Sequence, residues 1–236
     1  DCIDSSIIDL LRKHGVGVVE LGLQSLTEEV LLRSRRGHTA EQSLQALALL
    51  KEAGLKVGIQ LMPGLPGETN GSFLKTVDTV IRHAPDFVRL YPVLVVRDSG
   101  LERLYTAGTY RPMSLNRAIA LTARCCQRLE SHGVEVVRMG LQPTESLAES
   151  VVAGPYHPAF GELVRSRVWL GRIRAEVARL GPMQKLHIYI SHRDMSAVVG
   201  RKRCNIRRLE ELGFSGRFAV TVDKSMERRS IRYVVN

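Results

Sequence analysis

Short apolar runs rich in β-branched residues alternate with longer amphipathic runs along the first 142 residues of the chain. Capping signals flank the amphipathic runs, such as Thr39 before a segment with helical spacing that ends at Gly54. Strands that alternate with helices predict parallel strands joined by right-handed crossovers, in a barrel or in an open α/β sheet. Both architectures place functional residues at the carboxyl ends of the strands. The segments with strand character are residues 16–24, 58–62, 87–96 and 134–142.

The pattern changes after Leu141. A loop-rich connection leads into one long basic helix, and the last residues have a strand, helix, strand, strand pattern whose helix spans about 195–212. We therefore expect three parts: residues 1–142 as the α/β part, 143–181 as the connecting loop and basic helix, and 182–236 as a small α+β domain.

The formal net charge of +10 indicates a polyanionic partner such as nucleic acid, or else a solvated basic surface. The basic residues concentrate towards the C-terminus. No apolar run is long enough to span a membrane, so we expect no membrane partner. The four cysteines are too scattered for a disulfide framework, which favours a reducing, cytoplasmic location.

The strand at residues 58–62 runs directly into Pro63-Gly64-Leu65-Pro66-Gly67, through which neither a helix nor a strand can continue. Gly64 and Gly67 would let a flat ligand approach the backbone, because no Cβ stands in the way. The alternative is a loop shaped only by folding. No lysine follows as in a P-loop, so this turn does not indicate a nucleotide-phosphate site of that kind.

Two other groups of polar residues have both a structural and a functional interpretation. Glu20 and Gln24 alternate with apolar neighbours, so both are expected inside the same barrel, either as a satisfied polar pair or as ligand contacts. The arginines of residues 33–36 end one helix and precede another. They are either solvated partners of the helix dipole, or one of them turns inwards to clamp a carboxylate.

Taken together, VELGLQSLTEEVLLRSRRGHT (residues 19–39) and GIQLMPGLPGE (residues 58–68) resemble the radical S-adenosylmethionine superfamily. Within it they resemble the branch of the Elongator catalytic subunit and its shorter bacterial relatives, and the spacing is also that of oxygen-independent coproporphyrinogen oxidase. The resemblance covers residues 1–96 and implies the later strands of a (β/α) barrel with a small C-terminal α+β domain. It also implies reductive cleavage of S-adenosylmethionine at a [4Fe–4S] cluster.

The resemblance assigns a role to most of these polar positions. Gln24 would meet the ribose or the methionyl end of the cofactor, Arg36 would bind its carboxylate, and Gln60 would approach the ribose. Met62 and Gly64 would pack on the adenine. The implied cofactor-binding residues are Glu20, Gln24, Arg36, Gln60, Met62 and Gly64.

The cysteines depart from the family pattern. Members of this superfamily hold the cluster with three closely spaced cysteines after the first strand, whereas here Cys2 stands alone and Cys125 and Cys126 lie in a helical pattern. We therefore expect no metal ligands in this chain, and we interpret it as a fragment that begins after the third strand, with the cluster loop upstream. For the intact enzyme the resemblance implies a reductant protein such as flavodoxin or ferredoxin.

The segment VVGRKRCNIRRLEELG (residues 198–213) resembles the helix-loop-helix of a KH domain, in which a GXXG loop grips the nucleic-acid backbone. Arg203 stands where the second glycine is expected. The alternative is a basic, solvated cap that packs on the barrel. The candidate nucleic-acid-binding residues are Arg201, Lys202, Arg203, Arg207 and Arg208.

The charge and the Elongator resemblance together indicate RNA, in particular tRNA, as the substrate. Two other classes of function stay open from the sequence. One is a non-catalytic RNA-binding protein, and the other is a cluster-free α/β enzyme acting on a phosphorylated small molecule.

Overall fold

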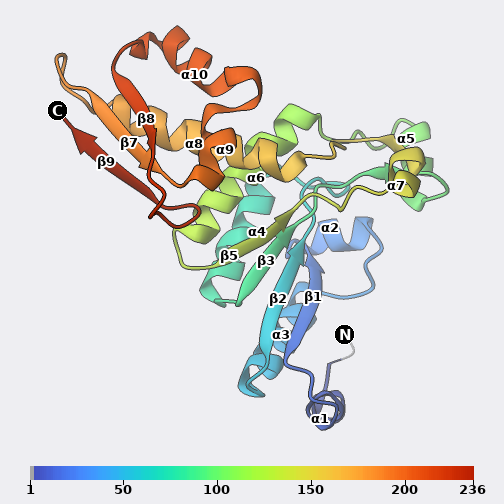
Figure 1. The fold of residues 1–236 in the computed structure, drawn as a ribbon. Coiled ribbons are helices and arrows are strands. Elements are labelled where there is room, and N and C mark those ends of the chain that lie inside the picture. The colour runs from blue at the N-terminus through green and yellow to red at the C-terminus, as the bar shows by residue number, and fades with distance from the viewer. Residues whose placement is uncertain (1–2) are drawn as a thin grey trace. The chain divides into compact units, whose positions relative to one another are not determined.

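A computed structural model describes residues 3–236, so Cys2 lies outside the described residues. The chain forms two compact units, which divide between Phe160 and Gly161 (Figure 1).

A parallel sheet forms the centre of the first unit, as the alternating pattern predicts. Its strands lie side by side in their order along the chain, which is the arrangement of consecutive strands in a barrel wall (Figure 1). In sheet order they are β1 (Val18–Gln24), β2 (Lys56–Leu61), β3 (Phe87–Leu90) and β5 (Glu135–Met139).

Helices connect these strands, and their ends follow the capping signals of the sequence. The Thr39 hydroxyl accepts a hydrogen bond from the Gln42 N–H while the Gln42 side chain accepts one from the Thr39 N–H, which fixes the start of α3. The helices of this unit are α1 (Ser5–Lys13), α2 (Glu28–Arg33), α3 (Ala40–Glu52), α4 (Asn70–Arg82), α5 (Gly100–Thr106), α6 (Leu115–Glu130) and α7 (Glu145–Ser150).

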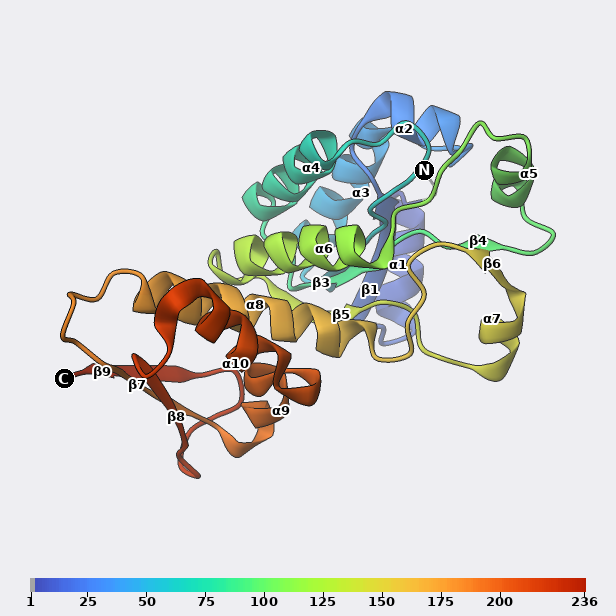
Figure 2. The same cartoon turned by 90° about the horizontal axis from the view of Figure 1, so that it is seen from above.

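The two faces of the sheet differ in character. Helices α3, α4 and α6 cover one face (Figures 1 and 2), where Val57, Ile59 and Leu61 of β2 are fully buried. Side chains alternate along a strand, so Gly58 and Gln60 face the other way. Gly58 makes room there for the Phe87 ring, because a Cβ at residue 58 would lie 2.2 Å from that ring. The face opposite the helices therefore carries the polar candidates.

The expectation of one strand over residues 87–96 is wrong. Strand β3 ends at Leu90, although the N–H groups of Tyr91 and Val93 still donate to the carbonyls of Leu61 and Pro63, and only Val95–Val96 (β4) becomes a strand again. Pro92 has no N–H to continue a ladder, and β4 pairs antiparallel with β6 (Val151–Ala153) instead. The loop-rich connection after Leu141 thus contains α7 and β6, and residues up to 160 group with the first unit.

The second unit is a three-stranded sheet covered by helices. Its central strand β7 runs parallel to β8 and antiparallel to β9. The basic helix α8 packs Trp169, Ile173 and Val177 into the same core as Leu186 and Ile188, so it groups with this unit. The elements are α8 (Phe160–Val177), β7 (Leu186–Ile190), α9 (Met195–Val199), α10 (Cys204–Leu209), β8 (Phe218–Val222) and β9 (Ile231–Val235).

The single helix expected over 195–212 is wrong, because the chain breaks between α9 and α10. Gly200 has φ +75°, and Lys202 and Arg203 also have left-handed backbone conformations. A Cβ at residue 200 would lie 2.6 Å from the Cys204 Sγ, so the close return of the chain depends on glycine. Residues 200–203 therefore form a loop between two short helices. Across residues 3–236, no helix combines the length and apolar character that crossing a membrane requires.

Candidate functional site

The end of β1 carries an unusual backbone conformation at Gln24. This residue has φ +65°, is 7% exposed, and accepts a hydrogen bond on its carbonyl from the Met62 N–H over 2.8 Å. Its side-chain Oε1 accepts from the Gln60 amide over 3.2 Å. Gly22 leaves the space for this amide, since a Cβ there would lie 2.4 Å from the Gln24 Nε2. Non-glycine residues held in this left-handed region are concentrated at functional sites.

Arg36 turns towards the same strand ends. Its Nη2 lies 2.9 Å from the Met62 Sδ, and partial burial lowers the pKa of the guanidinium from its ordinary value. A thioether is a weak acceptor, and within residues 3–236 Arg36 has no carboxylate partner. A half-buried guanidinium whose partner is a thioether retains most of its capacity to bind an anion.

The structure thus brings together most of the predicted cofactor residues. Gln24 contacts Gln60 and Met62, Met62 contacts Arg36, and Gly64 follows two residues later in the turn. These contacts place amide, guanidinium and thioether groups at the carboxyl ends of two neighbouring parallel strands, where ligands bind in folds of this class.

Glu20 has a protein partner. Its carboxylate forms an ion pair with Arg89 of β3 over 2.7 Å, and the same guanidinium donates to the Tyr91 hydroxyl over 3.3 Å. Arg89 did not stand out in the sequence, because its partner is 69 positions away and no local pattern joins them.

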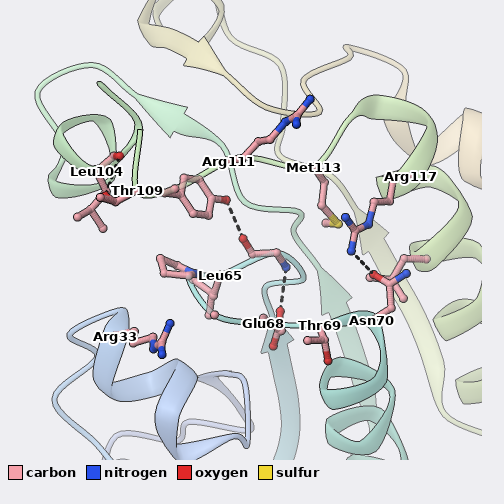
Figure 3. A pocket seen from close by; sticks show the side chains of 15 residues that line it. Arg33, Leu65, Glu68, Thr69, Asn70, Leu104, Thr109, Arg111, Met113 and Arg117 are labelled. Carbon is pink, nitrogen blue, oxygen red and sulfur yellow. Dashed lines mark hydrogen bonds between the residues drawn. The ribbon is translucent and has the colours of Figure 1, made fainter. Parts of the chain in front are cut away.

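The partly buried carboxyl group of Glu68 fixes the turn after β2. Glu68 Oε2 accepts from the Gly64 N–H over 2.8 Å (Figure 3). Its Oε1 accepts from the Ser25 hydroxyl over 2.9 Å. Burial raises the pKa of Glu68 to about 7. The Tyr110 hydroxyl donates to the Gly64 carbonyl over 2.7 Å, and burial raises the pKa of Tyr110 to about 12. Sequence reasoning missed both residues, although Glu68 ends the quoted motif.

The described residues do not supply ligands for an iron–sulfur cluster. Among residues 3–236, no group of three or more His, Cys, Asp or Glu side chains is placed to hold a metal ion. Cys125 and Cys126 are buried in α6, and burial raises the pKa of Cys125 to about 12, which opposes the thiolate form that binds metals. Cys204 is exposed and belongs to the other unit.

The second unit has its own cluster of candidate residues. The side chains of Arg201, Lys202 and Arg203 are exposed on three consecutive positions, and Arg207 and Arg208 are exposed on α10. Beside this loop lies a hollow of about 360 Å³, which could receive an apolar or flat group. It is lined by Met195, Val199, Arg203, Ile206, Glu210, Gly216, Phe218 and Val220.

Two family models match the chain in succession. The model of the radical SAM superfamily matches residues 2–80, and that of the radical SAM C-terminal domain matches residues 85–169. The chain is 38% identical over 121 residues to a tRNA uridine(34) acetyltransferase of Methanocaldococcus infernus. It is 35% identical over 127 residues to Elongator complex protein 3 of Saccharomyces cerevisiae. The alignments cover 50% and 52% of this chain, and the chain spans 22% of the length of each relative.

A solved structure has the same fold. It is the archaeal Elp3 of Methanocaldococcus infernus with an N-terminal deletion, which superposes with a TM-score of 0.64 at 30% sequence identity. The match covers 70% of this chain and 38% of that chain. The predicted partial (β/α) barrel of the radical SAM type is thereby confirmed.

Proposed function

Because the chain belongs to the radical S-adenosylmethionine superfamily, we propose that it binds S-adenosylmethionine at the carboxyl ends of β1 and β2 and acts within a tRNA-modifying enzyme. At a reduced [4Fe–4S] cluster this cofactor supplies radical chemistry. The cluster ligands would come from outside residues 3–236, and the electrons from a small carrier protein such as flavodoxin or ferredoxin.

One observation carries the cofactor part of this proposal: the half-buried Arg36 guanidinium has a thioether as its side-chain partner and, within residues 3–236, no carboxylate. The carboxylate of S-adenosylmethionine is a matching partner, because guanidinium and carboxylate groups form paired, charge-assisted hydrogen bonds. Met62 would then be free to pack on the adenine.

The remaining contacts follow from the same geometry. The Gln24 and Gln60 amides bond to each other over 3.2 Å, so each could exchange that contact for a ribose hydroxyl without leaving a buried polar group unpaired. The turn at Gly64 is held on both sides by Glu68 and Tyr110, which keeps its backbone in place against a flat ligand. Glu20 is engaged by Arg89 and is left out of the proposed contacts.

The tRNA part of the proposal rests on other observations. One relative is named as a tRNA uridine(34) acetyltransferase, and the chain has a net charge of +10. The exposed Arg201, Lys202 and Arg203 would contact the phosphate backbone, while the neighbouring hollow would receive a base.

The cofactor site can be tested by calorimetric titration of the chain with S-adenosylmethionine. We expect saturable binding that is lost in the Arg36→Ala, Gln24→Ala variant and retained in Arg35→Ala, which removes the neighbouring exposed arginine. Equal binding by all three proteins would place the cofactor elsewhere. The absence of saturable binding to the unmodified chain would contradict the proposal that these residues form a binding site.

A further inference from the structure

A second hollow, of about 450 Å³, lies in the first unit beside the turn after β2. Its walls are the turn itself, the start of α4, residues 104–113 and the first half of α6 (Figure 3). The volume is within the range of pockets that bind small molecules. Among its described lining residues, Gly64 is the one shared with the predicted cofactor residues, so the hollow is distinct from the site at Gln24 and Arg36.

Arginines reach this hollow from three different elements. Arg33 is the last residue of α2, Arg111 lies before α6, and Arg117 is in the first turns of α6. Figure 3 shows them on three sides of the hollow. Cations that gather from separate elements around one concave surface form a local field that attracts anions.

The surroundings position two of these side chains. Arg117 donates from Nη2 to the Asn70 Oδ1 over 3.2 Å, which directs it across the start of α4. The Arg33 stem lies against Gly67, where a Cβ would be 2.9 Å from the Arg33 Cδ, and its guanidinium pairs with Glu29. Arg111 is exposed, and within residues 3–236 it has no carboxylate partner.

The acidic side chain of the lining is already engaged. The Glu68 carboxyl accepts from Gly64 and Ser25, and burial raises its pKa to about 7, so it carries only part of a negative charge near neutral pH. Arg33 is largely balanced by Glu29. Arg111 and Arg117 therefore leave more than one positive charge uncompensated, which matches a multiply charged anion better than a single carboxylate.

We propose that this hollow binds a phosphate-bearing small molecule, whose phosphate groups are held by Arg111 and Arg117. Its remaining part would pack on the apolar wall formed by Leu65, Leu104 and Met113. Guanidinium groups bind phosphate oxygens in pairs, which gives both charge and direction. RNA backbone phosphate offers the same chemistry, but a hollow with an apolar wall favours a compact ligand of nucleotide size.

The test uses the whole chain with inorganic pyrophosphate and ADP as probes in calorimetric titrations. We expect saturable binding of at least ADP, weakened about tenfold or more in the Arg111→Gln, Arg117→Gln variant. The matched control is Arg82→Gln, Arg124→Gln, which removes two exposed arginines from α4 and α6 outside the hollow and should bind within about twofold of the original chain. Binding of neither probe, or equal binding by the two variants, would overturn the proposal.

Two further experiments distinguish RNA from a small molecule as the source of the phosphate, and the hollow from the candidate cofactor site. If a short RNA binds in a manner that depends on Arg111 and Arg117 while ADP and pyrophosphate do not bind, the hollow takes RNA backbone and the small-molecule proposal is wrong. The Arg36→Ala variant should bind ADP as the original chain does. If this variant loses binding of S-adenosylmethionine and keeps binding of ADP, the two sites are independent. If it loses binding of both ligands, the hollow is not a separate site.

Discussion

The Ser25 hydroxyl donates a hydrogen bond to the Glu68 carboxylate over 2.9 Å, although the two residues are 43 positions apart in the chain. The contact joins the segment after β1 to the turn after β2, and the second oxygen of Glu68 holds the Gly64 N–H. One partly buried carboxyl group thus fixes two segments that flank the candidate cofactor site.

The ionisation of Glu68 should make the chain less stable as the pH rises. Burial raises its pKa from 4.5 to about 7 in the folded state, so between these values the folded chain binds the proton that the unfolded chain has lost. Its contribution to the free energy of unfolding is complete below pH 4.5 and is lost as the pH rises towards 7, by up to about 3 kcal/mol. Urea unfolding at pH 5 and at pH 7.5 measures the change.

The Glu68→Gln variant is the control for that experiment, because it retains an acceptor of the same shape and does not titrate. Its stability should depend less on pH than that of the original chain, since all other ionisable groups are the same. Identical pH profiles of the two proteins would show that Glu68 does not have a raised pKa.

A side chain at Gly64 should disturb the turn in two ways. Its φ of +99° is unfavourable for any other residue, and a Cβ would lie 2.8 Å from the Met113 Cε. We expect Gly64→Ala to lower the free energy of unfolding by about 2 kcal/mol. Gly54→Ala, at φ +77° with nothing within 4 Å, should lower it by about 1 kcal/mol. Adding Met113→Ala to both variants should reduce the difference between their losses in free energy of unfolding. If that difference is unchanged, the contact between residue 64 and Met113 is unimportant.

Local patterns in the sequence were sufficient to predict most helices and the parallel sheet. Residues such as Thr39 and Gly54 act within one helical turn, so the bonds that they make are implied by their immediate neighbours. The strand expected over 87–96 failed for the opposite reason. Whether Val95 continues β3 or pairs elsewhere depends on β6, which lies more than 50 residues further along the chain.

The candidate site was predictable only where a family motif marks it. Gln24, Arg36, Gln60, Met62 and Gly64 come from the motifs, and the structure places them at neighbouring strand ends. The partners that hold these residues lie far away in sequence, and no periodicity signals a hydrogen bond between distant residues. The positive φ of Gln24 also has no local signal, because it follows from the packing of the strand end against the next strand.

The amide of Asn205 should be essential to the loop of the second unit. Asn205 is 4% exposed, and its Nδ2 lies 2.9 to 3.1 Å from four oxygen atoms of Ser166, Ala197 and Val198. In Asn205→Asp a carboxylate would face these oxygens, so we expect a loss of about 3 to 5 kcal/mol that lessens as the pH falls and the new carboxyl group is protonated.

Fluorescence of the single tryptophan, Trp169, reports unfolding of this unit, because it is buried in the same core. The control is Asn116→Asp, at an exposed position of α6 in the other unit, which should not shift the unfolding transition seen by fluorescence. A transition of Asn205→Asp that coincides with that of the original chain would contradict the proposed role of the amide.

The loop at residues 200–203 should dominate binding to tRNA if the second unit contacts RNA. Each phosphate contact that is removed lowers the slope of log affinity against log salt by about 0.7 to 0.9. The Arg201→Gln, Lys202→Gln, Arg203→Gln variant should therefore bind tRNA at least about tenfold more weakly, and the magnitude of its salt slope should fall by about 2.

The control for this variant is a triple variant of the first unit with the same change in charge, Arg12→Gln, Lys13→Gln, Arg82→Gln, all at exposed positions. Filter binding over a range of salt concentrations measures both quantities. If the two variants weaken binding equally, the attraction arises from the overall charge of the chain, and the loop has no special role.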